Sequence, residues 1–134
     1  MCIRDSVSAE RLRTAPTETP WFMSVGFSQT HRDFDDCDPS LPGQDPRYVR
    51  PPAPVPDTAA TRRDMACYAN RARLVDTCYG EVLAGLAASG QADRTIVICT
   101  TDHGIAFPDM KCRLTHHGTG VAPVSYTHLT LPTN

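Results

Sequence analysis

Residues 61–89 carry the longest regular pattern in this chain of 134 residues. Apolar side chains recur there at steps of three and four residues, which places them on one face of an α-helix. Thr61, with Asp64 three residues later, resembles an N-terminal capping arrangement, and Gly90 supplies a C-terminal stop. The pattern predicts one long helix with a solvated opposite face. The apolar stripe comprises Met65, Ala69, Ala72, Val75, Tyr79, Val82, Leu83 and Leu86.

Two short apolar runs flank this helix, at residues 21–27 and 95–101, and each has the composition of a buried strand. Residues 38–57 hold seven of the twelve prolines, so we expect an extended loop there. The order strand, helical connection, strand is a βαβ unit, whose strands run parallel with a right-handed crossover. The fold class predicted from the residues is therefore α/β, with parallel strands and a long crossover helix.

Composition excludes several classes of partner. The formal net charge is -2, which suggests neither nucleic acid nor an anionic membrane surface as a partner. No stretch approaches the roughly 18 apolar residues of a membrane span. The N-terminus lacks the apolar core of a signal peptide, so the sequence gives no location. The length suits one small domain.

The six cysteines are spread without C-x-x-C spacing, which excludes a zinc ribbon and a thioredoxin-like motif. Cys67 and Cys78 fall within the helical pattern and Cys99 within an apolar run. Free cysteine in such positions behaves as a small hydrophobic residue, so we expect buried thiols there. A disulfide between some pair of the six remains an open alternative.

Asp102 and His103 follow the second apolar run directly and precede Gly104. A carboxylate and an imidazole at a strand end are typical metal ligands, although three such residues also make an ordinary polar turn. If the strands are parallel, their carboxyl ends open on the same edge of the sheet, where α/β folds keep their ligand sites. We then expect His31, which follows the first run, to lie near Asp102 and His103.

Several motifs in a fixed order resemble the later part of a sulfatase catalytic domain, from about residue 20 to residue 122. The form Asp-His-Gly-x-x-Phe-Pro at residues 102–108 is similar to the heparan N-sulfatase, or sulfamidase-like, branch of the family. The order and spacing of the motifs carry the resemblance, since none is rare alone. The matching segments are residues 24–32, the Pro-rich stretch ending at 56–58, the helix through Asp76, and residues 95–104, 104–111 and 118–121.

The resemblance implies a partial alkaline-phosphatase-like α/β domain that hydrolyses sulfate esters or sulfamates with a divalent cation, usually Ca²⁺. Asp102 matches a metal-ligand aspartate and His103 the adjacent ligand position. Imidazole is commoner on Zn²⁺ or Mn²⁺ than on Ca²⁺, so His103 leaves the metal open. His31 matches the histidine that contacts the sulfate or the leaving group, and Lys111 matches the lysine that pairs with sulfate oxygens.

Each implied role has a physical reason. A metal ion and a lysine ammonium near the non-bridging sulfuryl oxygens stabilise transition-state charge. A histidine beside the leaving atom can donate the proton that an alcohol or amine needs. Arg32 is interpreted as a surface arginine, with a role toward an anionic substrate as the alternative. His116 and His117 suggest a second metal hypothesis, but adjacent residues on an extended segment point in opposite directions, so we expect a turn with at most one of them lining the site.

The departures from the family concern activity. Sulfatases of this kind use a C/S-x-P-x-R motif whose first residue becomes a formylglycine nucleophile; Cys37 is followed by a suitably placed Pro39 but lacks the arginine, and it lies too late in the chain. The paired aspartates of the first metal-binding segment are also missing, since Asp35 and Asp36 stand in the wrong place. We therefore expect a fragment that is inactive alone.

Residues 1–6 and 124–134 resemble translated sequencing-adapter read-through, which predicts a partial sulfatase domain over residues 7–123. The expected partner is a small sulfated substrate such as a sulfated sugar. Family members are commonly exported, periplasmic or lysosomal. Two alternatives remain: a metal-dependent phosphodiesterase or phosphonate hydrolase of the same superfamily, and a noncatalytic binding or structural module.

Overall fold

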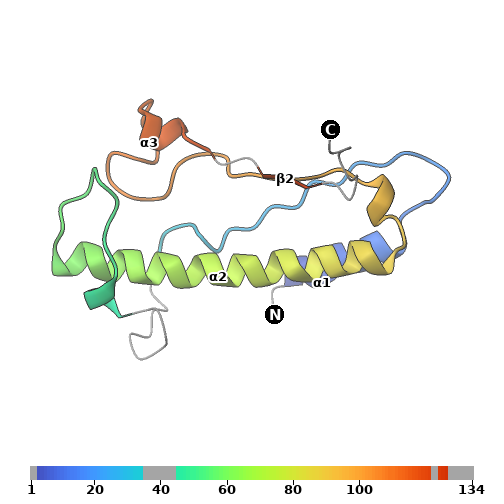
Figure 1. Cartoon of the computed structure of the whole chain (residues 1–134), viewed down its shortest axis with the longest axis horizontal. Coiled ribbons are helices and arrows are strands. Elements are labelled where there is room, and N and C mark those ends of the chain that lie inside the picture. The colour runs from blue at the N-terminus through green and yellow to red at the C-terminus, as the bar shows by residue number, and fades with distance from the viewer. Residues whose placement is uncertain (1–2, 35–44, 122–123, 127–134) are drawn as a thin grey trace, which may run out of the picture. The chain divides into compact units, whose positions relative to one another are not determined.

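The computed structural model describes residues 3–34, 45–121 and 124–126 (Figure 1). Contacts divide the described chain into two compact units. Unit 1 comprises residues 3–27, 77–100 and 124–126, and unit 2 comprises residues 28–34, 45–76 and 101–121. Within the described residues, no helix combines the length and the apolarity that a membrane span needs. The elements are α1 (Ile3–Arg13), the 3₁₀ helix η1 (Pro46–Tyr48), α2 (Ala59–Ala88), the 3₁₀ helix η2 (Ala92–Arg94), β1 (Val97–Cys99), α3 (His116–Thr119) and β2 (Val124–Tyr126).

Helix α2 confirms the predicted long helix, but it begins two residues before the predicted cap. Thr58 precedes the first turn, and its hydroxyl accepts from the Thr61 amide at 3.2 Å, while the Thr61 hydroxyl accepts from the Thr58 amide at 3.0 Å. This reciprocal pair satisfies two free amides of the first turn, as a capping box does. At the other end Gly90 has φ of +70°, a conformation that glycine adopts without steric cost, and it ends the helix as predicted.

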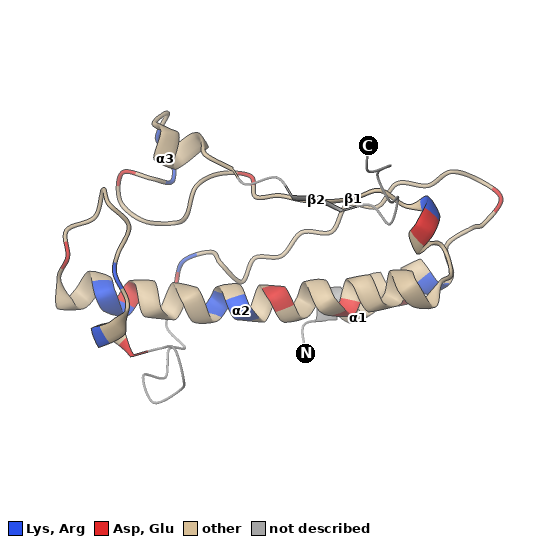
Figure 2. Cartoon of the chain, in the orientation of Figure 1, with Lys and Arg blue, Asp and Glu red and all other residues tan. Residues whose placement is uncertain are grey.

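The burial of α2 follows the predicted stripe only in part: apart from Leu83 and Leu86 its members are half-buried, while Ala66, Cys67 and Cys78, which lie outside it, are buried. Leu86 is buried, whereas Leu83, which belongs to the predicted apolar stripe, is exposed. Acidic and basic residues are interspersed along the helix (Figure 2). Such mixing of signs suits a solvated surface and presents no block of positive charge.

In unit 1, residues 21–27 run in an extended conformation along α2. The Trp21 indole donates to the Gln91 side chain at 3.1 Å, and the Phe27 ring meets Tyr79 edge-on at 5.3 Å. Alternate side chains of this segment are half-buried and the others exposed, which is the period of a one-sided strand. The prediction of a buried strand is therefore wrong for this segment, which is half-buried on one side and exposed on the other.

The predicted parallel strand pairing is not observed. Residues 21–27 are not a strand, and β1 is three residues long and pairs antiparallel with β2, with Val97 opposite Tyr126 and Cys99 opposite Val124. A strand is defined by its ladder of hydrogen bonds, and β2 supplies that ladder here.

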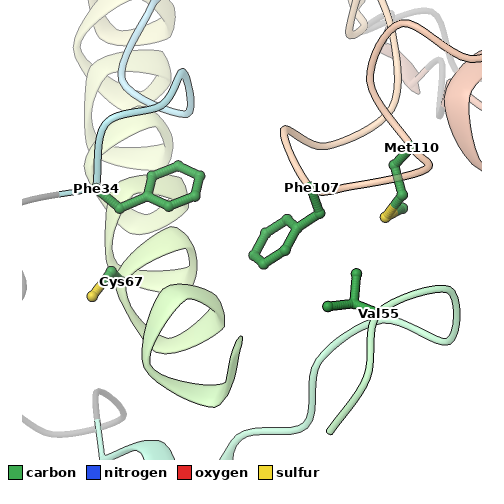
Figure 3. Close-up of a cluster of buried hydrophobic side chains, with 5 residues drawn as sticks. All are labelled: Phe34, Val55, Cys67, Phe107 and Met110. Carbon is green, nitrogen blue, oxygen red and sulfur yellow. The ribbon is translucent and has the colours of Figure 1, made fainter. Parts of the chain in front are cut away.

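Unit 2 is built around a small apolar cluster (Figure 3). Its buried members come from the loop after residue 28, the Pro-rich loop, α2 and the loop after residue 104, so the cluster holds four chain segments together. Cys67 is one of them and forms a disulfide, which corrects the predicted free thiol. Cys78 and Cys99 are free thiols as predicted, Cys78 fully buried and Cys99 partly so. The cluster comprises Phe34, Val55, Cys67, Phe107 and Met110.

Candidate functional site

Unit 2 brings His31 and Lys111 together. The Lys111 Nζ lies 2.9 Å from the His31 Nε2, although 80 residues separate the two in the chain. His31 is exposed and Lys111 is half-buried. The sequence predicted that His31 lies near Asp102 and His103; the contact that the structure shows for its Nε2 is instead with Lys111, the other predicted catalytic residue.

The ring of His31 is oriented from its other nitrogen. Its Nδ1 contacts the backbone carbonyl oxygen of Arg32, and a carbonyl only accepts, so this contact places the ring proton on Nδ1. The Nε2 then carries a lone pair, which accepts from the Lys111 ammonium. The backbone also turns here, because the His31 amide donates to the Ser28 carbonyl at 2.9 Å. In the contact between the two side chains, the Lys111 Nζ is therefore the donor and the His31 Nε2 the acceptor.

Lys111 is carried by a compact series of turns. The amide of Phe107 donates to Ile105 at 2.8 Å, that of Met110 to Phe107 at 3.2 Å, and that of Arg113 to Met110 at 3.3 Å. Phe107 and Met110 are buried in the apolar cluster, whereas Lys111 points out of it toward His31. The cluster thus fixes the backbone on the N-terminal side of Lys111.

Two glycines close this loop. The Gly104 amide donates to the Gly118 carbonyl at 2.8 Å, which joins the start of the loop to α3. A Cβ on Gly104 would collide with the carbonyl oxygen of His117, and one on Gly118 would collide with the carbonyl of Met110. Both positions therefore require glycine because backbone atoms fill the space. This explains why glycine stands at the start of the matched segment of residues 118–121.

Asp102 and His103 contact each other at the start of the same loop. The His103 Nε2 lies 3.4 Å from the Asp102 Oδ2, and its Nδ1 lies 2.7 Å from the Gly104 carbonyl oxygen. The Asp102 side chain is 87% exposed. In the described part of the chain, no group of three or more His, Cys, Asp or Glu side chains is arranged to hold a metal. Ca²⁺ takes six to eight oxygen ligands, so this pair does not by itself fit a Ca²⁺ ion.

His116 and His117 form the first turn of the short helix α3, which confirms the expected turn. Their ring centroids lie 3.9 Å apart, so the two rings are side by side and do not point in opposite directions. The prediction of opposed rings was based on an extended backbone, and the helical turn removes that premise. The described residues supply no further ligands for a metal at this position.

Arg32 has more partners than the sequence indicated. Its guanidinium pairs with Asp64 on α2, and it lies over the rings of Phe34, at 5.1 Å, and Phe107, at 5.6 Å. The side chain keeps 37% of its surface exposed, so the predicted surface position is correct but incomplete. No local pattern signals this arrangement, because Asp64 and Phe107 are distant in the chain.

Comparison with known proteins decides the family. A family model described as Sulfatase matches residues 5–126, which is most of the chain. The chain belongs to the sulfatase family. This confirms the resemblance read from the motifs, and the hydrolysis of sulfate esters or sulfamates is the chemistry of that family. An alkaline-phosphatase-like α/β fold is implied for the whole family domain.

This sulfatase chain is also similar to a human protein, the N-sulphoglucosamine sulphohydrolase of Homo sapiens. The two are 39% identical over 127 residues, which cover 76% of this chain and 24% of that relative. The sulfatase chain therefore spans about a quarter of the length of the relative. No solved structure gives a significant match.

Sulfatases generally use a divalent metal and a formylglycine residue. The present sequence contains no C/S-x-P-x-R motif, so none of its residues fits formylglycine, and no step below depends on that group. Cys37, Asp35 and Asp36, which the sequence reasoning compared with the missing motifs, lie outside the described residues. His31 and Lys111, the two predicted catalytic residues, both lie within the described residues.

Proposed function

We propose that this chain supplies the part of a sulfatase site that binds the sulfuryl group and protonates the leaving atom. The observation that carries the proposal is the 2.9 Å contact between His31 Nε2 and Lys111 Nζ. Both residues match sulfatase positions through sequence motifs, which are independent of this distance. An ammonium and an imidazole nitrogen that meet across the chain place a cation and a proton carrier beside each other, where an anionic group can bind the cation.

Lys111 supplies the charge. Its ammonium carries three donors, and only one is needed to meet His31, so the others are available to non-bridging sulfuryl oxygens. Negative charge on these oxygens persists through sulfuryl transfer, and a nearby cation stabilises it. Phe107 and Met110 hold the preceding backbone, which reduces the freedom that Lys111 loses on binding.

His31 supplies the proton. When the bond from sulfur to the leaving oxygen or nitrogen breaks, the bonding electrons stay on the leaving atom, which then takes up a proton. When Lys111 turns to the substrate, the freed Nε2 takes up a proton from water; His31 then donates that proton from Nε2 to the leaving atom and becomes the neutral ring again, with its other proton on Nδ1 toward Arg32. Lys111 moves its donor from Nε2 to a sulfuryl oxygen in the same complex.

The substrate class we propose is an N-sulfated amino sugar. The name of the human relative specifies N-sulphoglucosamine, and the Asp-His-Gly-x-x-Phe-Pro segment resembles the sulfamidase-like branch. Asp102 and His103 are proposed to contribute two donors to the divalent metal of the complete family site. The identity of that metal as Ca²⁺ stays a prediction, as does the domain range of residues 7–123.

Binding of N-sulfoglucosamine by the 134-residue chain tests the proposal, measured from NMR shifts with glucosamine 6-phosphate as the comparator. Lys111→Met removes the cation, and we expect about tenfold weaker binding, since charged hydrogen bonds contribute about 1.5–3 kcal/mol. Arg113→Met is the matched control, because Arg113 is an exposed cation two residues away that pairs with Asp109. Equal losses in both variants, or preference for the phosphate ester, would contradict the proposal.

A further inference from the structure

The backbone and side chain of Arg32 reach both members of the catalytic pair by different routes. Its carbonyl oxygen contacts the His31 Nδ1 directly. Its guanidinium lies over the Phe107 ring, 5.6 Å from the centroid, and Phe107 stands four residues before Lys111 in the same series of turns. Arg32 therefore contacts the His31 ring through its backbone carbonyl and, through its guanidinium, a residue of the turns that carry Lys111.

The side chain of Arg32 is anchored at three points. It pairs with Asp64 on α2, lies over Phe34 at 5.1 Å, and lies over Phe107. Phe34 and Phe107 are buried, and their ring centroids are 5.9 Å apart. A planar guanidinium can face aromatic rings and pair with a carboxylate at the same time, which an ammonium does less well. The anchoring thus depends on arginine specifically.

We infer that Arg32 is a positioning residue that sets the orientation of His31 toward Lys111; this rests on the proposed function of that pair. Asp64 neutralises the guanidinium charge, and the two rings cover part of its surface, so the charge is already used within the protein. Arg32 therefore acts through His31 and does not bind the sulfuryl group itself. This replaces both interpretations that the sequence alone allowed, an uninvolved surface arginine and an arginine that binds the substrate.

Arg32→Lys tests the inference, because it keeps the charge and removes the planar group. Arg47→Lys is the matched control: Arg47 also pairs with an aspartate, Asp45, and lies over an aromatic ring, Tyr48, but in the Pro-rich loop. The first measurement is the NMR cross-relaxation between the His31 ring protons and the Lys111 side chain, in the 134-residue chain without ligand. We expect Arg32→Lys to abolish this signal and Arg47→Lys to retain it, with the helical circular dichroism unchanged in both.

The second measurement separates positioning from general stabilisation. Inorganic sulfate is titrated into the wild type, Arg32→Lys, His31→Ala and the double variant. We expect Arg32→Lys to weaken sulfate binding about threefold to fivefold in the wild-type background, and by less than about twofold when His31 is already alanine. An equal loss in both backgrounds, or an unchanged cross-relaxation signal in Arg32→Lys, overturns the inference.

The two measurements also separate this inference from the proposed function. If the wild type binds no sulfate while Arg32→Lys loses the contact between His31 and Lys111, the positioning role stands and the proposed function fails. If sulfate binding depends on Lys111 while Arg32→Lys keeps the contact, the proposed function stands and the positioning role fails.

Discussion

The imidazole of His31 is held from both sides, by the Arg32 carbonyl at Nδ1 and by Lys111 at Nε2. A histidine fixed in this way has a defined tautomer, and Nε2 is the nitrogen that can take up a proton and pass it to the leaving atom. Motif order predicted both side chains. The sequence did not indicate the distance between them. That distance depends on the burial of Phe107 and Met110, and no periodic pattern marks the residues of a loop that become buried.

Gly104 gives a direct test of the loop that carries Lys111. In Gly104→Ala the new methyl group meets the His117 carbonyl, and backbone cannot yield as a side chain can. We expect a loss of about 1–3 kcal/mol in the free energy of unfolding, measured with urea, together with weaker sulfate binding. Gly26→Ala is the control, since a Cβ there meets nothing within 4 Å. Equal stability of the two variants would show that the loop adopts a different backbone.

Tyr68 gives unit 2 a dependence on alkaline pH. Burial raises the pKa of Tyr68 above its ordinary value, so the folded state favours the neutral phenol. An unfolded tyrosine loses its proton near pH 10, so this contribution to stability is complete below about pH 10 and is lost as the pH rises through the higher pKa of the folded state. We expect the thermal midpoint to fall above pH 10.

The comparison of two phenylalanine variants isolates this effect. Tyr68→Phe removes the group that titrates, so its thermal midpoint depends less on pH above 10 than that of the wild type. Tyr48→Phe is the control, because Tyr48 is 84% exposed. A wild-type slope in Tyr68→Phe would assign the alkaline loss to other groups.

At the scale of elements, periodicity was a good guide to helix and conformation but not to pairing. Helix α2 follows from apolar steps of three and four residues, whereas the one-sided burial of residues 21–27 differs from the buried strand that their composition predicts. Pairing depends on which backbone offers free donors and acceptors nearby, and for β1 the partner is β2. Val124–Tyr126 was assigned to a foreign tail, and so it was not considered as a strand.

The contact between α1 and α2 depends on one glycine. A Cβ on Gly85 would lie 2.7 Å from the Ala9 Cα, closer than atoms can pack, whereas a Cβ on Gly80 meets nothing within 4 Å. Alanine favours helix over glycine by about 1 kcal/mol, so we expect Gly80→Ala to stabilise the chain by about this amount. Gly85→Ala should instead destabilise it by about 1–3 kcal/mol, measured by chemical denaturation. Stabilisation by both would show that α1 does not pack on α2.

At the scale of the whole molecule, the family assignment gives the class of reaction, whereas the described geometry gives the contacts of a few candidate site residues. The family model spans residues 5–126, and the site residues proposed for this chain are His31, Asp102, His103 and Lys111. The relative at 39% identity is about four times longer. Motif order identifies the family because the order can be recognised within a stretch about a quarter as long as the relative. A complete set of metal ligands, in contrast, requires side chains from several chain segments at once.

Calcium titration tests the incomplete metal set. Asp102 and His103 offer two donors, and Ca²⁺ requires at least six, so we expect no heat of binding below about 1 mM calcium. Asp102→Ala should give the same titration as the wild type. Stoichiometric binding at micromolar calcium that Asp102→Ala abolishes would show a metal site that the described residues do not reveal.

The central claim is that His31 and Lys111 act on the same bound sulfuryl group, Lys111 at its oxygens and His31 at the leaving atom. Its most direct test follows the side-chain NMR signals of both residues while sulfate is added to the 134-residue chain. The account predicts that the two signals shift together with one dissociation constant, and that His31 no longer responds in Lys111→Met. Independent shifts with two constants, or a His31 response that survives the loss of Lys111, would contradict it.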